Sequence, residues 1–122
     1  MTAVAKFEVS EAAVRAGDAA TDGPPGVLLR IAGELDVASS PRLETELRQL
    51  LDAGNIHVVI DMADVEFIDA SGIGLLVTAA DRARAEGGYL VLNRPSDRVT
   101  RVIDVLGLNG ALPVRRDRER TD

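Results

Sequence analysis

From residue 27 onward, short apolar runs alternate with longer segments in which apolar residues recur every three or four positions. Residues 27–32, 56–60 and 89–92 form the apolar runs, and the second is rich in β-branched residues, as is typical of a buried strand in a largely parallel sheet. Strands that alternate with helices indicate an α/β domain, with right-handed crossovers between the parallel strands. Residues 7–14 are expected to add a strand, and Gly33 to close the strand that starts at Val27.

Three segments between and after these runs have helical spacing. Ser40, followed by a proline that suits the first helical position, starts the first helix, Ser71 opens the second, and Ser96 caps the third. The faces expected to be buried are Leu43, Leu47, Leu50 and Leu51 in the first helix, Ile73, Leu76, Val77 and Ala80 in the second, and Val99, Val102, Ile103 and Leu106 in the third.

The length of 122 residues allows one domain. We expect residues 1–114 to form it, with a single mixed sheet of four to five strands packed with three or four helices. Residues 15–26 have the composition of a solvated loop, and residues 111–114 form an optional edge strand because Pro113 cannot donate to a central ladder. Residues 115–122 are charged, have nothing to bury and are expected to be disordered.

Composition excludes several classes of function. The formal net charge of −6 and the presence of only two phenylalanines, one tyrosine and no tryptophan argue against nucleic-acid binding. The absence of cysteine excludes disulfides and thiolate metal sites. The N-terminus lacks the apolar core of a signal peptide, and no segment approaches the roughly 20 apolar residues that cross a bilayer. We therefore expect a cytoplasmic protein that does not insert into membranes and binds a protein partner.

Enzymatic chemistry finds little support in the residues. A serine-hydrolase triad would need His57, the only histidine, but it lies inside an apolar run, and Ser71 has no G-x-S-x-G context. His57 is expected on the solvent side of its strand or bonded to a neighbouring backbone group. Neither a Walker sequence nor a dinucleotide fingerprint is present. The prediction is a protein without enzymatic activity or cofactor.

Four carboxylates near expected strand ends, Asp36, Asp61, Asp64 and Asp69, leave a Mg²⁺ site of the receiver type as an alternative. A receiver also uses a lysine at the end of a late strand, and Lys6 lies too early in the chain to serve. Asp61 and Asp64 are expected instead to make turn contacts with their own backbone.

Two segments that follow strands and precede helices combine acidic residues with serine. Residues 33–41 contain Asp36, Ser39 and Ser40, and residues 65–76 contain Asp69 and Ser71. In an α/β sheet such strand ends can converge on one edge. Ser71 has two interpretations: it is the N-cap of its helix, or it offers an exposed hydroxyl whose phosphate would be accepted by the free N–H groups of the helix start.

Taken together, the two segments resemble the anti-sigma factor antagonists of the STAS domain family, and the resemblance runs from the first strand to about Val114. The residues that carry it are Gly33-Glu34-Leu35-Asp36 with Ser40-Pro41, and Phe67-Ile68-Asp69-Ala70-Ser71-Gly72-Ile73-Gly74. The resemblance implies the STAS fold and a bacterial regulator of transcription.

For this chain the resemblance implies binding to an anti-sigma factor that is also a serine kinase, which frees a sigma factor. Ser71 matches the residue that the kinase phosphorylates to end binding, and a serine phosphatase would reverse the modification. Asp69 matches the acid two positions before it, and Asp36 the acid of the first segment. Family members often carry two adjacent hydroxyls where this chain has Ala70 and Ser71, which leaves one acceptor.

The expected partner-binding surface joins both segments and consists of Asp36, Ser39, Ser40, Asp69, Ser71, Gly72, Ile73 and Gly74. Asp36 is expected to have no structural duty, because Ser39 or Ser40 takes the cap role. We expect a monomer or weak dimer. The alternative function is a constitutive subunit that binds the ATPase of a lipid-exporting ABC transporter, since single-domain proteins of that kind are also similar.

Overall fold

The computed structural model describes residues 8–14 and 26–115. Strands and helices follow one another in the order expected from the sequence, and the α/β class is confirmed. The elements are β1 (Glu8–Val14), β2 (Gly26–Leu35), α1 (Ser40–Asp52), β3 (His57–Ile68), α2 (Ala70–Ala85), β4 (Tyr89–Asn93), α3 (Asp97–Val105) and β5 (Val114–Arg115).

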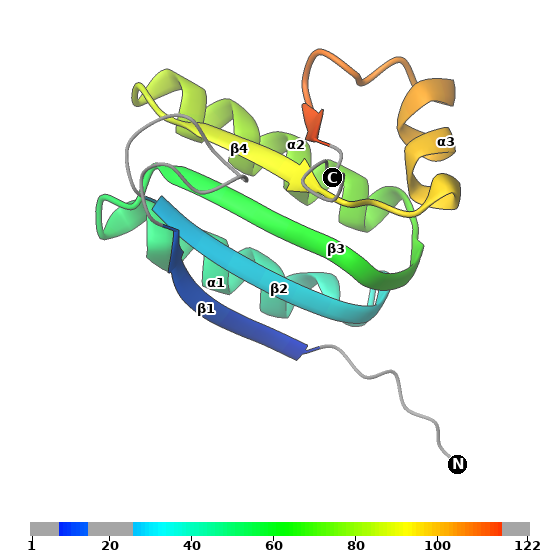
Figure 1. Cartoon of the computed structure of the whole chain (residues 1–122), viewed down its shortest axis with the longest axis horizontal. Helices are drawn as coiled ribbons and strands as arrows, with labels where there is room; N and C mark the ends of the chain where they lie inside the picture. Colours follow the sequence, from blue (N-terminus) through cyan, green and yellow to red (C-terminus); the bar gives the residue numbers. More distant parts are fainter. Residues whose placement is uncertain (1–7, 15–25, 116–122) are drawn as a thin grey trace, which may run out of the picture.

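The five strands form one mixed sheet in the order β1-β2-β3-β4-β5. β1 is antiparallel to β2, whereas β2, β3, β4 and β5 are parallel to one another. Helices α1 and α2 lie behind the sheet in Figure 1, and α3 stands beyond the ends of β3 and β4. Because β2 and β3 are parallel, the turns that lead into α1 and α2 both follow the carboxyl ends of these strands, on the same side of the sheet.

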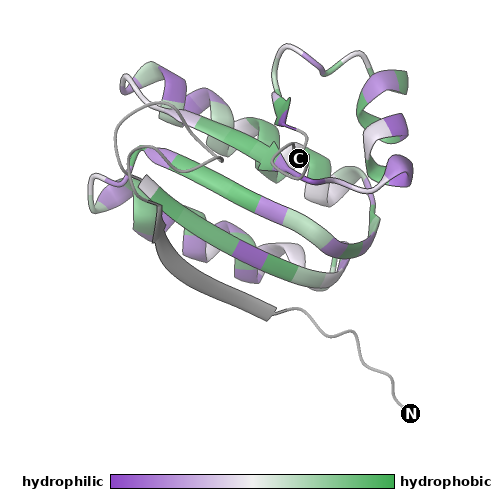
Figure 2. Ribbon diagram, in the orientation of Figure 1, coloured by the Kyte–Doolittle hydropathy of each residue, from purple (hydrophilic) through white to green (hydrophobic). Residues whose placement is uncertain are grey.

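The hydrophobic core fills the space between the sheet and the helices, and β3 and β4 are largely green in Figure 2. The expected apolar face of α1 is confirmed, since all four of its leucines are buried. In α2 the buried set includes Ile73, Leu76 and Ala80, while Val77 is only partly buried. No helix in the described part of the chain is long and apolar enough to cross a membrane.

Two strands are longer than the sequence predicted. β2 continues through Gly33 to Leu35, so the expected end at Gly33 is wrong. This glycine has a φ of 99° and lies at a bulge, where the pairing of β2 with β3 shifts its register. The strand continues beyond the bulge. β3 runs to Ile68, and Asp61 and Asp64 therefore lie within the strand and not near its end.

The C-terminal part departs from expectation in two places. Ser96 caps α3 as predicted, its hydroxyl accepting the Val99 N–H, but Leu106 is 53% exposed and lies after the helix. Residues 111–114 contribute only Val114 to a strand, and Arg115, expected in the disordered tail, pairs in β5. The rest of that tail, the loop at 15–25 and residue 7 of the expected first strand lie outside the described residues.

Candidate functional site

The turn from β3 into α2 is organised by Asp69. This residue is the N-cap of α2, and its Oδ1 accepts the N–H groups of Ser71, at 2.9 Å, and Gly72, at 3.2 Å. The Asp69 N–H donates to the Leu35 carbonyl at 3.1 Å, which ties the turn to the end of β2. Ser71 is the second residue of the helix and is exposed. The interpretation of Ser71 as the N-cap is therefore wrong, because Asp69 holds that position.

The cap also changes what a phosphate on Ser71 would meet. The N–H groups of Ser71 and Gly72 are taken by the Asp69 carboxylate, and the Ile73 N–H donates to the Asp69 carbonyl at 3.0 Å. A phosphate on Ser71 would therefore have to compete with the Asp69 carboxylate for the Ser71 and Gly72 N–H groups, and its acceptance by the helix start stays a prediction. The Ser71 hydroxyl itself makes no hydrogen bond to any other residue that the structure describes.

The turn from β2 into α1 uses its polar side chains internally. Asp36 Oδ1 accepts the N–H groups of Ala38, at 3.0 Å, and Ser39, at 3.1 Å. The Ser39 hydroxyl donates to the Glu34 carbonyl at 2.6 Å and accepts the Asp36 N–H at 3.0 Å. Ser39 is the N-cap of α1 but makes no side-chain cap bond. Asp36 does have a structural duty, contrary to expectation, because it folds this turn.

The two turns meet at one end of a groove of about 600 Å³ between α1 and α2. Val37 and Ser40 line it from the first turn, and Ala70, Ser71 and Gly74 line it from the second. The predicted convergence of the two segments is thus present in the fold. Val37, which is 71% exposed, was missed by the sequence reasoning, although a lone valine in a polar turn is a detectable signal.

Three of the predicted partner-binding residues are buried. Gly72 and Ile73 face the core, and Ser40 is 7% exposed, with a hydroxyl that has no hydrogen-bond partner in the described structure. A Cβ on Gly72 would lie 2.8 Å from Leu35 Cγ and 2.9 Å from Ile68 Cγ1. Gly72 therefore allows α2 to start against the ends of β2 and β3, which is a packing role.

At its other end the groove is bordered by an ion-pair cluster. Arg82 Nη2 lies 2.8 Å from Asp52 Oδ1, which joins α2 to α1, and Arg82 Nε lies 2.9 Å from Glu86 Oε2. The hydrogen bonds to Glu86 and Asp52 raise the pKa of Arg82 above its ordinary value. Arg82, expected to face water, is thus engaged with neighbouring carboxylates.

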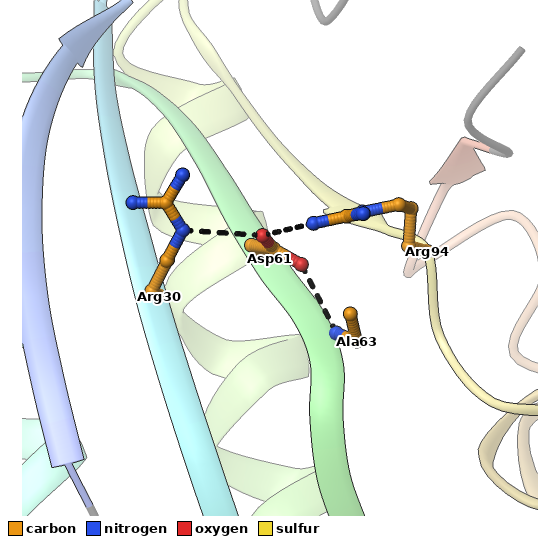
Figure 3. Close-up of polar contacts among 4 residues, drawn as sticks. All are labelled: Arg30, Asp61, Ala63 and Arg94. Carbon is orange, nitrogen blue, oxygen red and sulfur yellow. Dashed lines mark hydrogen bonds and ion pairs between the residues drawn. The ribbon is translucent and has the colours of Figure 1, made fainter. Parts of the chain in front are cut away.

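Asp61 lies in the middle of β3, away from this groove, and faces arginines (Figure 3). It is 5% exposed, and its Oδ2 lies 2.7 Å from Arg94 Nη2 and 3.5 Å from Arg30 Nε. Its Oδ1 accepts the Ala63 N–H at 3.0 Å, a contact with its own backbone as expected, but within β3 and not in a turn. No group of three or more metal-ligating side chains occurs in residues 8–14 and 26–115. His57, half-buried, packs its ring edge-on against Tyr89 with centroids 5.0 Å apart.

Comparison with known proteins bears on this site. Residues 18–120 match the family model described as the STAS domain. This chain belongs to the STAS domain family. Among curated relatives, the anti-sigma-B factor antagonist of Bacillus subtilis is 33% identical over 88 residues, which cover 72% of this chain and 80% of the relative. The protein of the same name from Staphylococcus epidermidis is 30% identical over 75% of this chain and 84% of its own length.

Solved structures support the STAS fold. An anti-sigma factor antagonist from Mycobacterium paratuberculosis superposes with a TM-score of 0.76 at 21% identity, covering 98% of this chain and 93% of that one. The unphosphorylated form of the anti-sigma factor antagonist SpoIIAA gives a TM-score of 0.69 at 21% identity, with 93% and 91% of the chains covered. The phosphorylated form of SpoIIAA from Bacillus gives 0.64 at 20% identity, with 93% and 95% covered. The relatives are regulatory binding proteins and not enzymes, which confirms the prediction that this STAS domain is not an enzyme.

Proposed function

We propose that this STAS domain is an anti-sigma factor antagonist whose binding is controlled by phosphorylation of Ser71. In the unphosphorylated state it binds an anti-sigma factor that is also a serine kinase, and so releases a sigma factor for transcription in the cytoplasm. The kinase phosphorylates Ser71, which ends binding, and a serine phosphatase restores it. The named curated relatives, all anti-sigma-B factor antagonists, support this role over that of a transporter subunit.

The availability of the Ser71 hydroxyl is the observation that carries the proposal. Ser71 is exposed at the head of α2 and lines the groove, whereas the Ser39 hydroxyl is held by Glu34 and the Ser40 hydroxyl is buried. A kinase that approaches this end of the fold therefore finds one free serine hydroxyl in the two turns. That SpoIIAA, a protein of the same fold, has been solved in phosphorylated and unphosphorylated forms supports a cycle of this kind.

The proposal is tested with the anti-sigma factor kinases encoded in the same genome, purified and incubated one by one with this chain and Mg-ATP. We expect one kinase to bind the chain and to add one phosphate, which peptide mass spectrometry locates at Ser71. Ser71→Ala should remain unmodified. Stoichiometric phosphorylation of Ser71→Ala by the same kinase would show that the acceptor lies elsewhere.

Binding provides the second arm of the test. Ser71→Ala removes a small exposed group and should bind the anti-sigma factor about as well as the wild type. Ser71→Glu places a charge at the groove and should bind at least roughly tenfold more weakly, a loss of about 1.4 kcal/mol. Equal affinities of the two variants in titration calorimetry would reject control by charge at Ser71.

A further inference from the structure

The groove between α1 and α2 continues far beyond Ser71. Along α2 it is lined by Ser71, Gly74, Thr78 and Arg82, which follow one another on successive turns. At 1.5 Å per residue the distance from Ser71 to Arg82 is about 16 Å. A partner that contacts Ser71 therefore lies at one end of the groove and can extend along it.

The floor of the groove is apolar, and its α2 side is unusually open. Leu47 and Leu51 of α1 face Leu75 and Ala79 of α2 across it. A Cβ on Gly74 would meet nothing within 4 Å, so internal packing gives no reason for a glycine there. A glycine inside a helix costs about 0.5–1 kcal/mol relative to alanine. The missing side chain leaves room for an atom that comes from outside this chain.

The residues that line the mouth of the groove beside Ser71 are uncharged, and the Asp36 and Asp69 carboxylates in the adjoining turns bond to backbone N–H groups. Val37 projects there with 71% of its surface exposed, and Pro41 and Ala70 line the same end. One rim further along carries Glu44 and Arg48, whose side chains are 62% and 55% exposed and lie 3.9 Å apart. A partner surface that is apolar in its centre and charged at its edge would complement both the apolar mouth and the charged rim.

The walls of the groove decide the conformation of what can lie in it. Both walls are helices, whose backbone groups already bond within the helix, so an extended segment would gain no backbone hydrogen bonds from them. A helix satisfies its own backbone groups and can pack its side-chain ridges between those of α1 and α2. The groove therefore fits a helix laid lengthwise.

We infer that an amphipathic helix of the anti-sigma factor lies along the α1–α2 groove and covers Ser71 with its apolar face. The inference rests on the proposed function. It also gives the switch a physical cause: a phosphate on Ser71 would lose its water under an apolar surface, and the Asp69 carboxylate already occupies the neighbouring N–H groups. Because desolvation is not screened by ions, salt should restore little of the lost affinity.

A charge placed in the groove away from Ser71 tests the inference. Thr78 is exposed and lies seven residues, about 10 Å, beyond Ser71 along α2. Thr78→Glu should weaken binding of the anti-sigma factor that the wild type binds by at least roughly tenfold. The control is Thr45→Glu, the same substitution at an exposed position of α1 that does not line the groove, and it should change affinity less than about twofold.

Thiol protection gives a readout that needs no loss of affinity. Because the chain has no cysteine, Thr78→Cys and Thr45→Cys each carry one reactive group. The rate of alkylation by iodoacetamide should fall at least roughly tenfold for the Thr78→Cys thiol in the complex, the mark of a covered site, and should stay unchanged for the Thr45→Cys thiol.

The outcomes separate the two proposals. If the wild type binds an anti-sigma factor but Thr78→Glu binds equally well and the Thr78→Cys thiol stays reactive, the helix does not lie in the groove and only this inference is overturned. If no anti-sigma factor of the genome binds the wild type, the proposed function fails, and the inference is overturned with it.

Discussion

The turn between β2 and α1 and the turn between β3 and α2 both place an aspartate shortly before a serine. In each, the aspartate carboxylate accepts two backbone N–H groups. In the first turn the Ser39 hydroxyl is bonded on both sides, to Glu34 and Asp36, whereas in the second no described residue bonds the Ser71 hydroxyl. The comparison teaches that local hydrogen bonds, and not residue type, decide which serine is available for modification.

The largest effect on the free energy of unfolding is expected for a substitution at Gly72, which packs where the turn into α2 meets the ends of β2 and β3. Gly72→Ala puts a Cβ within 3.0 Å of Leu35 and Ile68, and overpacking of this kind costs about 1–3 kcal/mol. In Gly74→Ala, two residues further along the same helix, the added Cβ would contact nothing within 4 Å. This variant should be more stable than the wild type by about 0.5–1 kcal/mol. Urea unfolding measures both. Equal behaviour of the two variants would mean that α2 does not start against the strand ends.

The next largest effect on stability is expected for Ser39→Ala, and it should distinguish Ser39 from Ser71. Ser39→Ala removes one donated and one accepted hydrogen bond, and at about 1 kcal/mol each the free energy of unfolding should fall by about 2 kcal/mol. Ser71→Ala should stay within about 0.5 kcal/mol of the wild type, because its hydroxyl is exposed. Calorimetry of the two variants measures the difference. A drop for Ser71→Ala as large as for Ser39→Ala would abolish the contrast between the turns.

Loss of the α2 cap should have a smaller effect. Asp69→Ala leaves the N–H groups of Ser71 and Gly72 without their acceptor, which for an N-cap costs about 1 kcal/mol. The thermal midpoint should fall by about 4 °C. Asp69→Asn keeps a side-chain oxygen as acceptor and should lose less. If Asp69→Ala melts like the wild type, the carboxylate does not hold the helix start.

The smallest effect is expected for Asp36→Asn. An amide oxygen can still accept the N–H groups of Ala38 and Ser39, so the thermal midpoint should stay within a few degrees of the wild type. Asp36→Ala, which removes the acceptor, should cost about 1 kcal/mol. Comparison of the two variants by thermal unfolding separates the acceptor role of Asp36 from its charge. A midpoint for Asp36→Asn as low as that for Asp36→Ala would make the charge itself structural.

Apolar periodicity was enough to predict the order of elements and the buried face of α1. It could not predict that β2 passes through Gly33, because a bulge depends on pairing with β3 and not on the residue alone. Leu106 was predicted to be buried since its spacing continues the apolar face of α3, but the helix ends at Val105. Spacing indicates which side of a helix is apolar and does not fix where the helix stops.

The site was predictable as two converging segments and not in its details. Both Ser71 and Asp69 can serve as N-cap by residue type, and only the backbone at Asp69, with ψ of −172°, gives it that position. The α1–α2 groove depends on how two helices pack, so Thr78 carried no mark in the sequence that linked it to Ser71. Burial of Ser40 likewise follows from packing, whereas that of Ile73 was expected from the apolar spacing of α2.

The buried carboxylate of Asp61 bears on how the sheet finds its alignment. Arg30 becomes available to it when β2 pairs with β3, but Arg94, 33 residues further on, arrives only when the crossover through α2 has placed β4. A slip of β4 by one residue would turn its side chains to the opposite face and carry Arg94 away. The buried carboxylate would then keep only the more distant Arg30 and the Ala63 N–H, which is unfavourable for a charge removed from water. Asp61 therefore adds an electrostatic penalty for misaligned sheets to the one that the buried Leu90 and Leu92 of β4 already impose.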